Sequence, residues 1–121
     1  MRILLLAALA GLAGTPTAMA GEADVIAATA TPASDGTWRI SATLRHDDAG
    51  WDHYADAWEV VGPDGTVLAR RVLLHPHVDE QPFTRSQSGI AIPPGVTQVI
   101  IRAHDTVHGY GGQEVQLTLQ P

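Results

Sequence analysis

The sequence predicts an all-β fold in which seven strands pack as a two-sheet sandwich. Turn-forming residues recur about every 8–12 residues, the spacing typical of such a sandwich. Residues 38–45 alternate apolar and polar side chains, which is the period of two expected for a half-buried strand. No stretch after residue 20 shows apolar residues at a spacing of 3.6 over two turns, so no helix is expected.

The first three strands are expected at residues 25–31, 38–45 and 54–61. Pro32 and the Ser34-Asp35-Gly36 turn end the first strand. The alternation of the second continues to His46, which lies on its apolar face, and a polar loop (47–53) follows. The third strand is expected to carry Asp56, Trp58 and Val60 on one face.

The remaining strands are expected at residues 67–74, 82–92, 96–104 and 115–119. Pro63-Asp64-Gly65 forms a tight hairpin turn before the fourth strand, and Pro93-Pro94-Gly95 forms another after the fifth. Residues 75–81 and 105–112 form two further polar loops, each with two histidines in it or beside it.

Seven short strands with a tryptophan on the third resemble an immunoglobulin-like or fibronectin III-like β-sandwich. The resemblance covers residues 21–121 and is architectural, because the chain has no cysteine pair. It implies that Trp58 is buried against the opposite sheet.

The first twenty residues are typical of a secretory signal peptide. Arg2 supplies the positive charge, residues 3–13 form the apolar stretch, and Ala18-Met19-Ala20 forms a small-x-small cleavage site before Gly21. We therefore expect a signal peptide (1–20), a single domain (21–121) and no membrane insertion after cleavage. No cysteine follows the cleavage site, so a lipid anchor there is not expected.

The charge and the absence of sulfur residues after residue 20 indicate which partners the chain can bind. From residue 21 onward, six arginines against thirteen acidic residues give a formal net charge of −7, with no lysine, methionine or cysteine. An acidic chain without lysine is a poor binder of polyanions, so nucleic acid is not an expected partner. Without cysteine or methionine, a bound metal ion is expected to be Cu(II) or Zn(II) rather than Cu(I).

All six histidines lie in or beside three predicted loops. Successive loops of a sandwich alternate between its two ends, so the loops 47–53, 75–81 and 105–112 should meet at one end. Imidazole is the commonest metal ligand in proteins. The sequence therefore predicts a metal site there, with candidate ligands, in order of preference, His75, His77, His108, His53, His104 and His46.

His75 and His77 lead this order because Pro76 between them stiffens the loop. Side chains expected to orient the ligands, or to contact them, are Asp52, Asp56, Asp105 and Arg85. Arg85 is expected to pair with Asp56 if it points inward.

Other interpretations of these residues remain open. A single loop histidine is usually solvated or hydrogen bonded, His46 is also typical of a buried core histidine, and His104 of an exposed one. The exposed aromatics Trp51 and Tyr110 suggest instead a non-catalytic interaction module that binds a protein or glycan. No Gly-x-Ser-x-Gly or His-Glu-x-x-His motif is present, so no catalytic residues are expected, although three histidines would suffice for a metal-dependent enzyme.

Three stretches resemble those of small uncharacterised exported proteins of Gram-negative bacteria: WDHYADAW (51–58), HPHVDEQPFTRS (75–86) and VHGYGG (107–112). The resemblance implies a periplasmic location and no particular activity. A functional analogy exists with periplasmic copper-handling sandwiches, which hold Cu(II) through histidines at one end. A metal ion and a periplasmic protein are therefore the expected partners.

Overall fold

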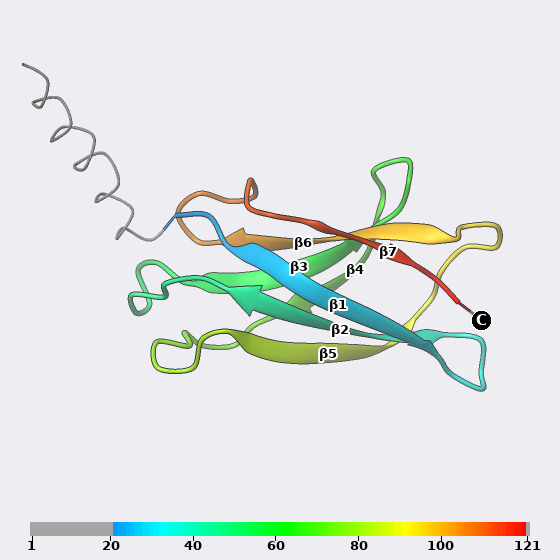
Figure 1. Ribbon diagram of the computed structural model, residues 1–121, viewed down its shortest axis with the longest axis horizontal. Helices are drawn as coiled ribbons and strands as arrows, with labels where there is room; N and C mark the ends of the chain where they lie inside the picture. Colours follow the sequence, from blue (N-terminus) through cyan, green and yellow to red (C-terminus); the bar gives the residue numbers. More distant parts are fainter. Residues whose placement is uncertain (1–20, 121) are drawn as a thin grey trace, which may run out of the picture.

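A computed structural model of the chain describes residues 21–120, which form seven strands and no helix (Figure 1). The strands are β1 (Asp24–Pro32), β2 (Trp38–Arg45), β3 (Ala55–Val61), β4 (Val67–Val72), β5 (Phe83–Ile90), β6 (Gln98–Asp105) and β7 (Val115–Thr118). Each overlaps its expected range, and no helix capable of spanning a membrane occurs in the described residues. The expected signal peptide (1–20) lies outside the described residues.

The strands form two antiparallel sheets that face each other. One sheet has the order β1-β2-β5 and the other the order β4-β3-β6-β7. The chain crosses between the sheets after β2, β4 and β5. The prediction of a seven-strand, two-sheet all-β fold is confirmed.

Apolar side chains that alternate along the strands form the core between the sheets. On β2 the buried residues are Ile40, Ala42 and Leu44, and on β6 they are Val99, Ile101 and Ala103. Trp58 of β3 is 1% exposed at the centre of this core. Among the residues that the structure describes, the core extends from Ala23 to Leu119.

The three histidine-bearing loops lie at the same end of the sandwich, as predicted. Figure 1 shows the β2–β3, β4–β5 and β6–β7 connections together at the left, away from the β1–β2, β3–β4 and β5–β6 turns. Hydrogen bonds link the three connections to one another, from His77 to Asp48 and from Thr106 to Asp52. We call this the histidine end.

One expectation about β3 is wrong, because the strand contains a β-bulge. The register of β3 against β6 shifts between Ala55 and Ala57, and such an extra residue re-aims a side chain. The Asp56 carboxylate contacts His104, which alternates with the buried residues of β6, rather than sharing the core face of Trp58. The expected Arg85–Asp56 pair does not form, because the Arg85 guanidinium contacts His77 and Glu80 instead.

Truncation of the buried tryptophan should destabilise the fold strongly. Replacing Trp58 with alanine leaves a large cavity in the core, and we expect a loss of about 3–5 kcal/mol in the free energy of unfolding. Trp51→Ala is the matched control: the Trp51 side chain is 67% exposed, and its loss should change stability by less than about 0.5 kcal/mol. Urea denaturation followed by circular dichroism measures both, and equal losses would contradict the assigned core.

Candidate metal centre

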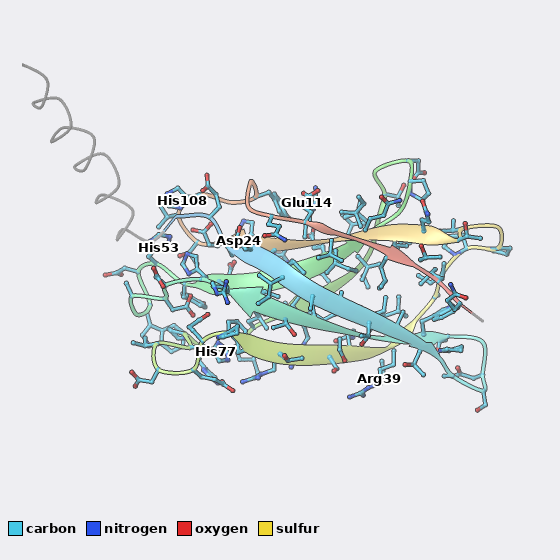
Figure 2. The ribbon with its side chains drawn as sticks, in the orientation of Figure 1. Asp24, Arg39, His53, His77, His108 and Glu114 are labelled. Carbon is cyan, nitrogen blue, oxygen red and sulfur yellow. The ribbon has the colours of Figure 1, made fainter. Side chains whose placement is uncertain are left out.

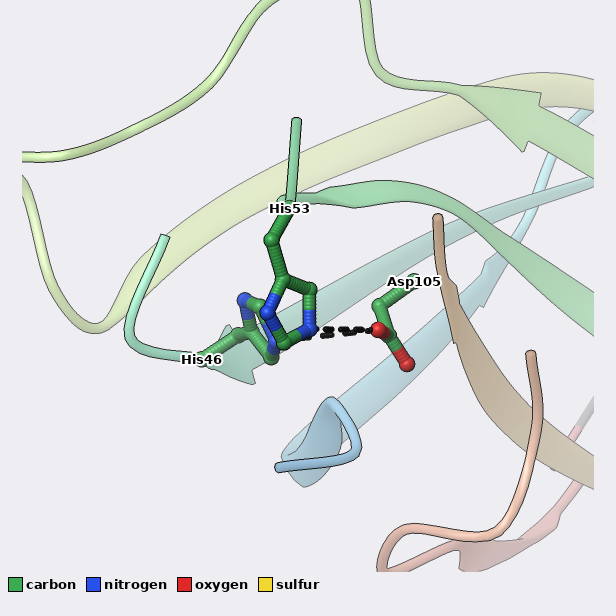
Figure 3. A group of neighbouring side chains, drawn as sticks. All are labelled: His46, His53 and Asp105. Atoms are coloured by element: carbon green, nitrogen blue, oxygen red, sulfur yellow. Dashed lines mark hydrogen bonds and ion pairs between the residues drawn. The ribbon is translucent and has the colours of Figure 1, made fainter. Parts of the chain in front are cut away.

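The side chains of His46, His53 and Asp105 converge at the histidine end (Figure 3). His46 directly follows β2, His53 lies in the β2–β3 loop, and Asp105 is the last residue of β6. One atom from each, two Nε2 nitrogens and a carboxylate oxygen, lie within 4.8 Å of one another. The sandwich thus brings together residues from the ends of two sheets, although His46 and Asp105 are 59 positions apart in the sequence.

The separations match those around a first-row metal ion. The Nε2 atoms of His46 and His53 are 3.3 Å apart. Asp105 Oδ2 lies 2.8 Å from His53 Nε2 and 4.0 Å from His46 Nε2. A tetrahedral ion with bonds of about 2.0–2.1 Å separates its ligand atoms by about 3.3–3.4 Å. A square-planar ion with similar bonds separates neighbouring ligands by about 2.8–3.0 Å. A tetrahedral ion would require the Asp105–His53 separation to lengthen and the Asp105–His46 separation to shorten. A square-planar ion would accept Asp105 and His46 as opposite ligands, about 4.0–4.2 Å apart, and would require only the two Nε2 atoms to move slightly closer.

A buried carboxylate fixes the His46 ring. Asp48 Oδ1 lies 2.5 Å from His46 Nδ1, and both side chains are fully buried. The same carboxylate accepts backbone N–H groups from Ala55, at 2.9 Å, and from His77, at 2.7 Å. Ligating histidines usually donate their second ring N–H to such a carboxylate, which directs the other nitrogen toward the metal. Asp48 leaves the Nε2 of His46 facing the centre.

His46 Nε2 also lies 2.9 Å from the backbone carbonyl oxygen of Gly21. With Nδ1 donating to Asp48, a hydrogen bond to this carbonyl requires a second ring proton. Burial disfavours charge on the ring, but the hydrogen bond and charge of Asp48, the Gly21 carbonyl and the charge of Asp105 outweigh it and raise the His46 pKa. The surroundings of Nε2 thus favour a positive charge, either a proton or a metal cation.

Asp105 is ionised and incompletely hydrogen bonded. Burial raises its pKa, but the N–H groups of His108 and Val107 and the rings of His108 and His53 lower it overall. These groups all contact Oδ2. Its other oxygen, Oδ1, is buried with no hydrogen-bond partner. An unpartnered buried carboxylate oxygen is costly, and a bound cation would offset that cost.

His108 lies at the edge of this centre. Its Nδ1 is 3.1 Å from Asp105 Oδ2, and its ring centroid is 5.0 Å from that of His53. The side chain is 36% exposed, so its ring borders solvent. Figure 2 shows His53 and His108 close together at the histidine end.

His75 and His77, the first choices from the sequence, form a separate pair. Their ring centroids are 4.6 Å apart, and His77 stacks on Phe83 at 3.9 Å. His77 Nε2 faces the Arg85 guanidinium at 3.0 Å. Burial, then the charges of Arg85 and His75, lower the His77 pKa, so its ring is neutral and accepts this hydrogen bond. The geometry therefore reverses the order of preference, while ligation by this pair stays a prediction.

The other expected residues are not among the three that converge. His104 bonds Asp56 through Nδ1 at 2.5 Å and packs edge-on against Tyr110. Tyr110 itself lies beneath the Arg102 guanidinium, 4.0 Å from its ring centroid. Asp52 accepts a hydrogen bond from Thr106 through its backbone oxygen.

Two contributors are not singled out by the sequence, and a third has a role other than the expected one. Asp48 is only one of several carboxylates expected at this end of the sandwich, and Gly21 is expected only as the residue after the cleavage site. Asp105 was expected to support the ligands, yet its Oδ2 is one of the three converging atoms. A carboxylate two residues after a histidine at a strand end was the available indication for Asp48, but sequence cannot show which way a loop folds back.

Comparison with known proteins finds similarity over part of a longer protein. The chain is 49% identical over 92 residues, 76% of its length, to a protein of Halomicrobium mukohataei named putative lipoprotein. It spans only 45% of the length of that relative. No family model and no solved structure matches the chain.

The bond between Asp48 and His46 should appear in the pH dependence of stability. A raised His46 pKa contributes stability that is fully present below about pH 6.5 and is lost as pH rises through the folded-state value. Asp48→Asn removes the carboxylate charge, so it should lower the His46 pKa and cost about 1–3 kcal/mol near pH 6. The cost should be smaller near pH 9.

Histidine NMR titration and urea denaturation at the two pH values measure these effects. The matched control is Asp79→Asn, which removes the same charge from an exposed residue of the β4–β5 loop and should change neither quantity. An unchanged His46 pKa in Asp48→Asn would contradict the assigned role.

Proposed function

We propose that this protein binds one Cu(II) or Zn(II) ion through His46 Nε2, His53 Nε2 and Asp105 Oδ2, with His108 at the edge of the site. The observation that carries the proposal is the convergence of these three atoms around a histidine oriented by buried Asp48. Orientation of a ligand before the ion arrives lowers the entropic cost of binding.

Charge also supports a divalent cation. Asp48 and Asp105 are both buried and both have lowered pKa values, so two negative charges lie in the protein interior. His46, when protonated, neutralises only one of them. A divalent ion in place of that proton would balance both carboxylates and approach the unpartnered Oδ1 of Asp105.

The ligand types fit Cu(II) and Zn(II) better than Cu(I). Imidazole suits both ions and carboxylate is a hard ligand, whereas Cu(I) prefers the sulfur of cysteine and methionine. Residues 21–121 contain neither sulfur residue. Storage, delivery or sensing of the ion are the roles consistent with a site of this kind on a sandwich.

We further propose that the protein is exported to the periplasm of a Gram-negative cell and is an immunoglobulin-like or fibronectin III-like sandwich. The relative named putative lipoprotein supports export, as does the predicted signal peptide. Buried Trp58 on the third strand supports the fold type.

A second candidate is the interaction module. Trp51, Leu74 and Val78 are all more than half exposed in loops of the histidine end, and such side chains are typical of protein contacts. Tyr110 is a weaker anchor, because it packs against His104 and Arg102. The two functions are compatible, since a protein that delivers an ion must also contact its recipient.

Substitution of the converging residues should abolish tight metal binding. We expect His53→Ala and Asp105→Asn to weaken Zn(II) or Cu(II) affinity by about 100-fold or more, because each removes one ligand (about 2.7 kcal/mol). Isothermal titration of metal-free protein (residues 21–121), with each ion in turn, measures the affinity. His75→Ala is the matched control, an exposed histidine outside the centre, and should leave affinity within about twofold.

Two outcomes would contradict the proposal. A wild-type dissociation constant above about 10 μM (about −7 kcal/mol) would be no better than scattered surface histidines achieve. The interaction module would then be the remaining candidate function. Loss of binding in His75→Ala with retention in His53→Ala would instead place the ion at the His75–His77 pair.

Metal affinity should fall on the acid side of neutrality. Ligation by His46 requires a deprotonated Nε2, and its pKa is raised above 6.5, so affinity should decrease as pH falls through that value. Asp48→Asn lowers the His46 pKa and should move the decrease to lower pH while weakening affinity by about 10–100-fold. Titrations at several pH values between 5 and 9 test this, and a pH-independent affinity would exclude His46 as a ligand.

A further inference from the structure

We infer that the amino group of Gly21, set free by removal of residues 1–20, is itself a ligand of the metal centre, so that the site is completed only when the precursor is processed. The inference rests on the proposed metal-binding function. It adds a main-chain ligand, the Gly21 amine, to the three side-chain ligands. It also makes full metal affinity depend on removal of residues 1–20.

The starting observation is the position of Gly21. Its carbonyl oxygen is 2.9 Å from His46 Nε2, a separation that also suits two ligands of one ion. A cavity of about 290 Å³ beside it is lined by Gly21, Glu22, Asp24, Arg45, His46 and Asp47. The start of the described chain therefore lies against the histidine whose Nε2 faces the centre.

The segment from Gly21 to Asp24 is held firmly in this place. Ala23 is 1% exposed, and the Val25 N–H donates to the Gln113 carbonyl at 2.9 Å. The Asp24 carboxylate accepts the Gln113 N–H at 2.7 Å. Gly112 passes so close that an added Cβ would lie 2.0 Å from the Ala23 carbonyl oxygen. These contacts, all made by residues from Ala23 onward, fix the chain directly after Gly21.

Covalent geometry brings the amino nitrogen within reach. In one residue the nitrogen and carbonyl oxygen are about 2.7–3.6 Å apart, depending only on rotation about the Cα–C bond. At the short end of that range both atoms can bind one ion as a five-membered chelate. A free terminus can rotate in this way while the carbonyl stays in place.

In the precursor this nitrogen is not available. There it belongs to the Ala20–Gly21 peptide bond, whose nitrogen lone pair is delocalised into the carbonyl and is a poor ligand. Hydrolysis of that bond by a signal peptidase consumes one water, leaving a carboxylate on Ala20 and an amine on Gly21. The predicted cleavage site Ala18-Met19-Ala20 places the new terminus at this residue.

The composition of the chain makes the inference easy to test. It contains no lysine, so from residue 21 onward the terminal amine is the only primary amine. Among amines, a reagent such as acetic anhydride therefore acetylates only the N-terminus. Mass spectrometry measures the acetylated fraction.

The experiment compares protein beginning at Gly21 with protein that retains Ala20 as one additional residue. Both contain the core described above, from Ala23 to Leu119, and their urea unfolding midpoints verify that both fold. We expect the extension to weaken Zn(II) or Cu(II) affinity by about tenfold or more in isothermal titration. Bound metal should also slow acetylation of Gly21 severalfold in the first protein, but not acetylation of Ala20 in the second.

The outcomes separate this inference from the function on which it rests. Equal affinities, with acetylation unaffected by metal, would overturn the ligand role of the terminus and leave the metal site of His46, His53 and Asp105 intact. Failure of both proteins to bind tighter than about 10 μM would overturn both. The intact mass of the exported protein must also correspond to a chain that begins at Gly21. A different N-terminal residue would refute the dependence on processing.

Discussion

The histidine end depends on the buried hydrogen bond between Asp48 and His46. Asp48 accepts the His46 ring and the N–H groups of Ala55 and His77, so one carboxylate joins the end of β2, the start of β3 and the β4–β5 loop. Its negative charge inside the protein requires a partner, and the His46 ring supplies it. The direction of His46 Nε2, and hence the position of the candidate centre, follows from this bond.

The sequence sufficed for the architecture because strands and turns are local features. Alternation at residues 38–45 and the turns at Gly36, Gly65 and Gly95 set the strands, and alternating loops placed the histidines at one end. Which histidines meet was not predictable in this way. It depends on the bulge at Asp56, on the stacking of His77 on Phe83 and on a loop that turns Asp48 inward.

Two histidines of the histidine end, His46 and His77, have opposite electrostatic surroundings. His46 lies between carboxylates and has a raised pKa, whereas His77 faces the Arg85 guanidinium and has a lowered one. A cation is therefore better stabilised at His46, which contacts the Asp48 carboxylate, than at His77, which contacts the Arg85 guanidinium. This contrast, more than the number of histidines, supports our assignment of the metal to His46, His53 and Asp105.

The central claim is that His46 Nε2 binds the ion while Nδ1 keeps its proton for Asp48. Long-range ¹H–¹⁵N NMR of the histidine rings during Zn(II) titration observes this directly. The account predicts that one equivalent shifts the Nε2 resonances of His46 and His53, leaves His46 Nδ1 protonated and leaves both His75 nitrogens unchanged. Shifts confined to His75 and His77, or loss of the His46 Nδ1 proton, would contradict it.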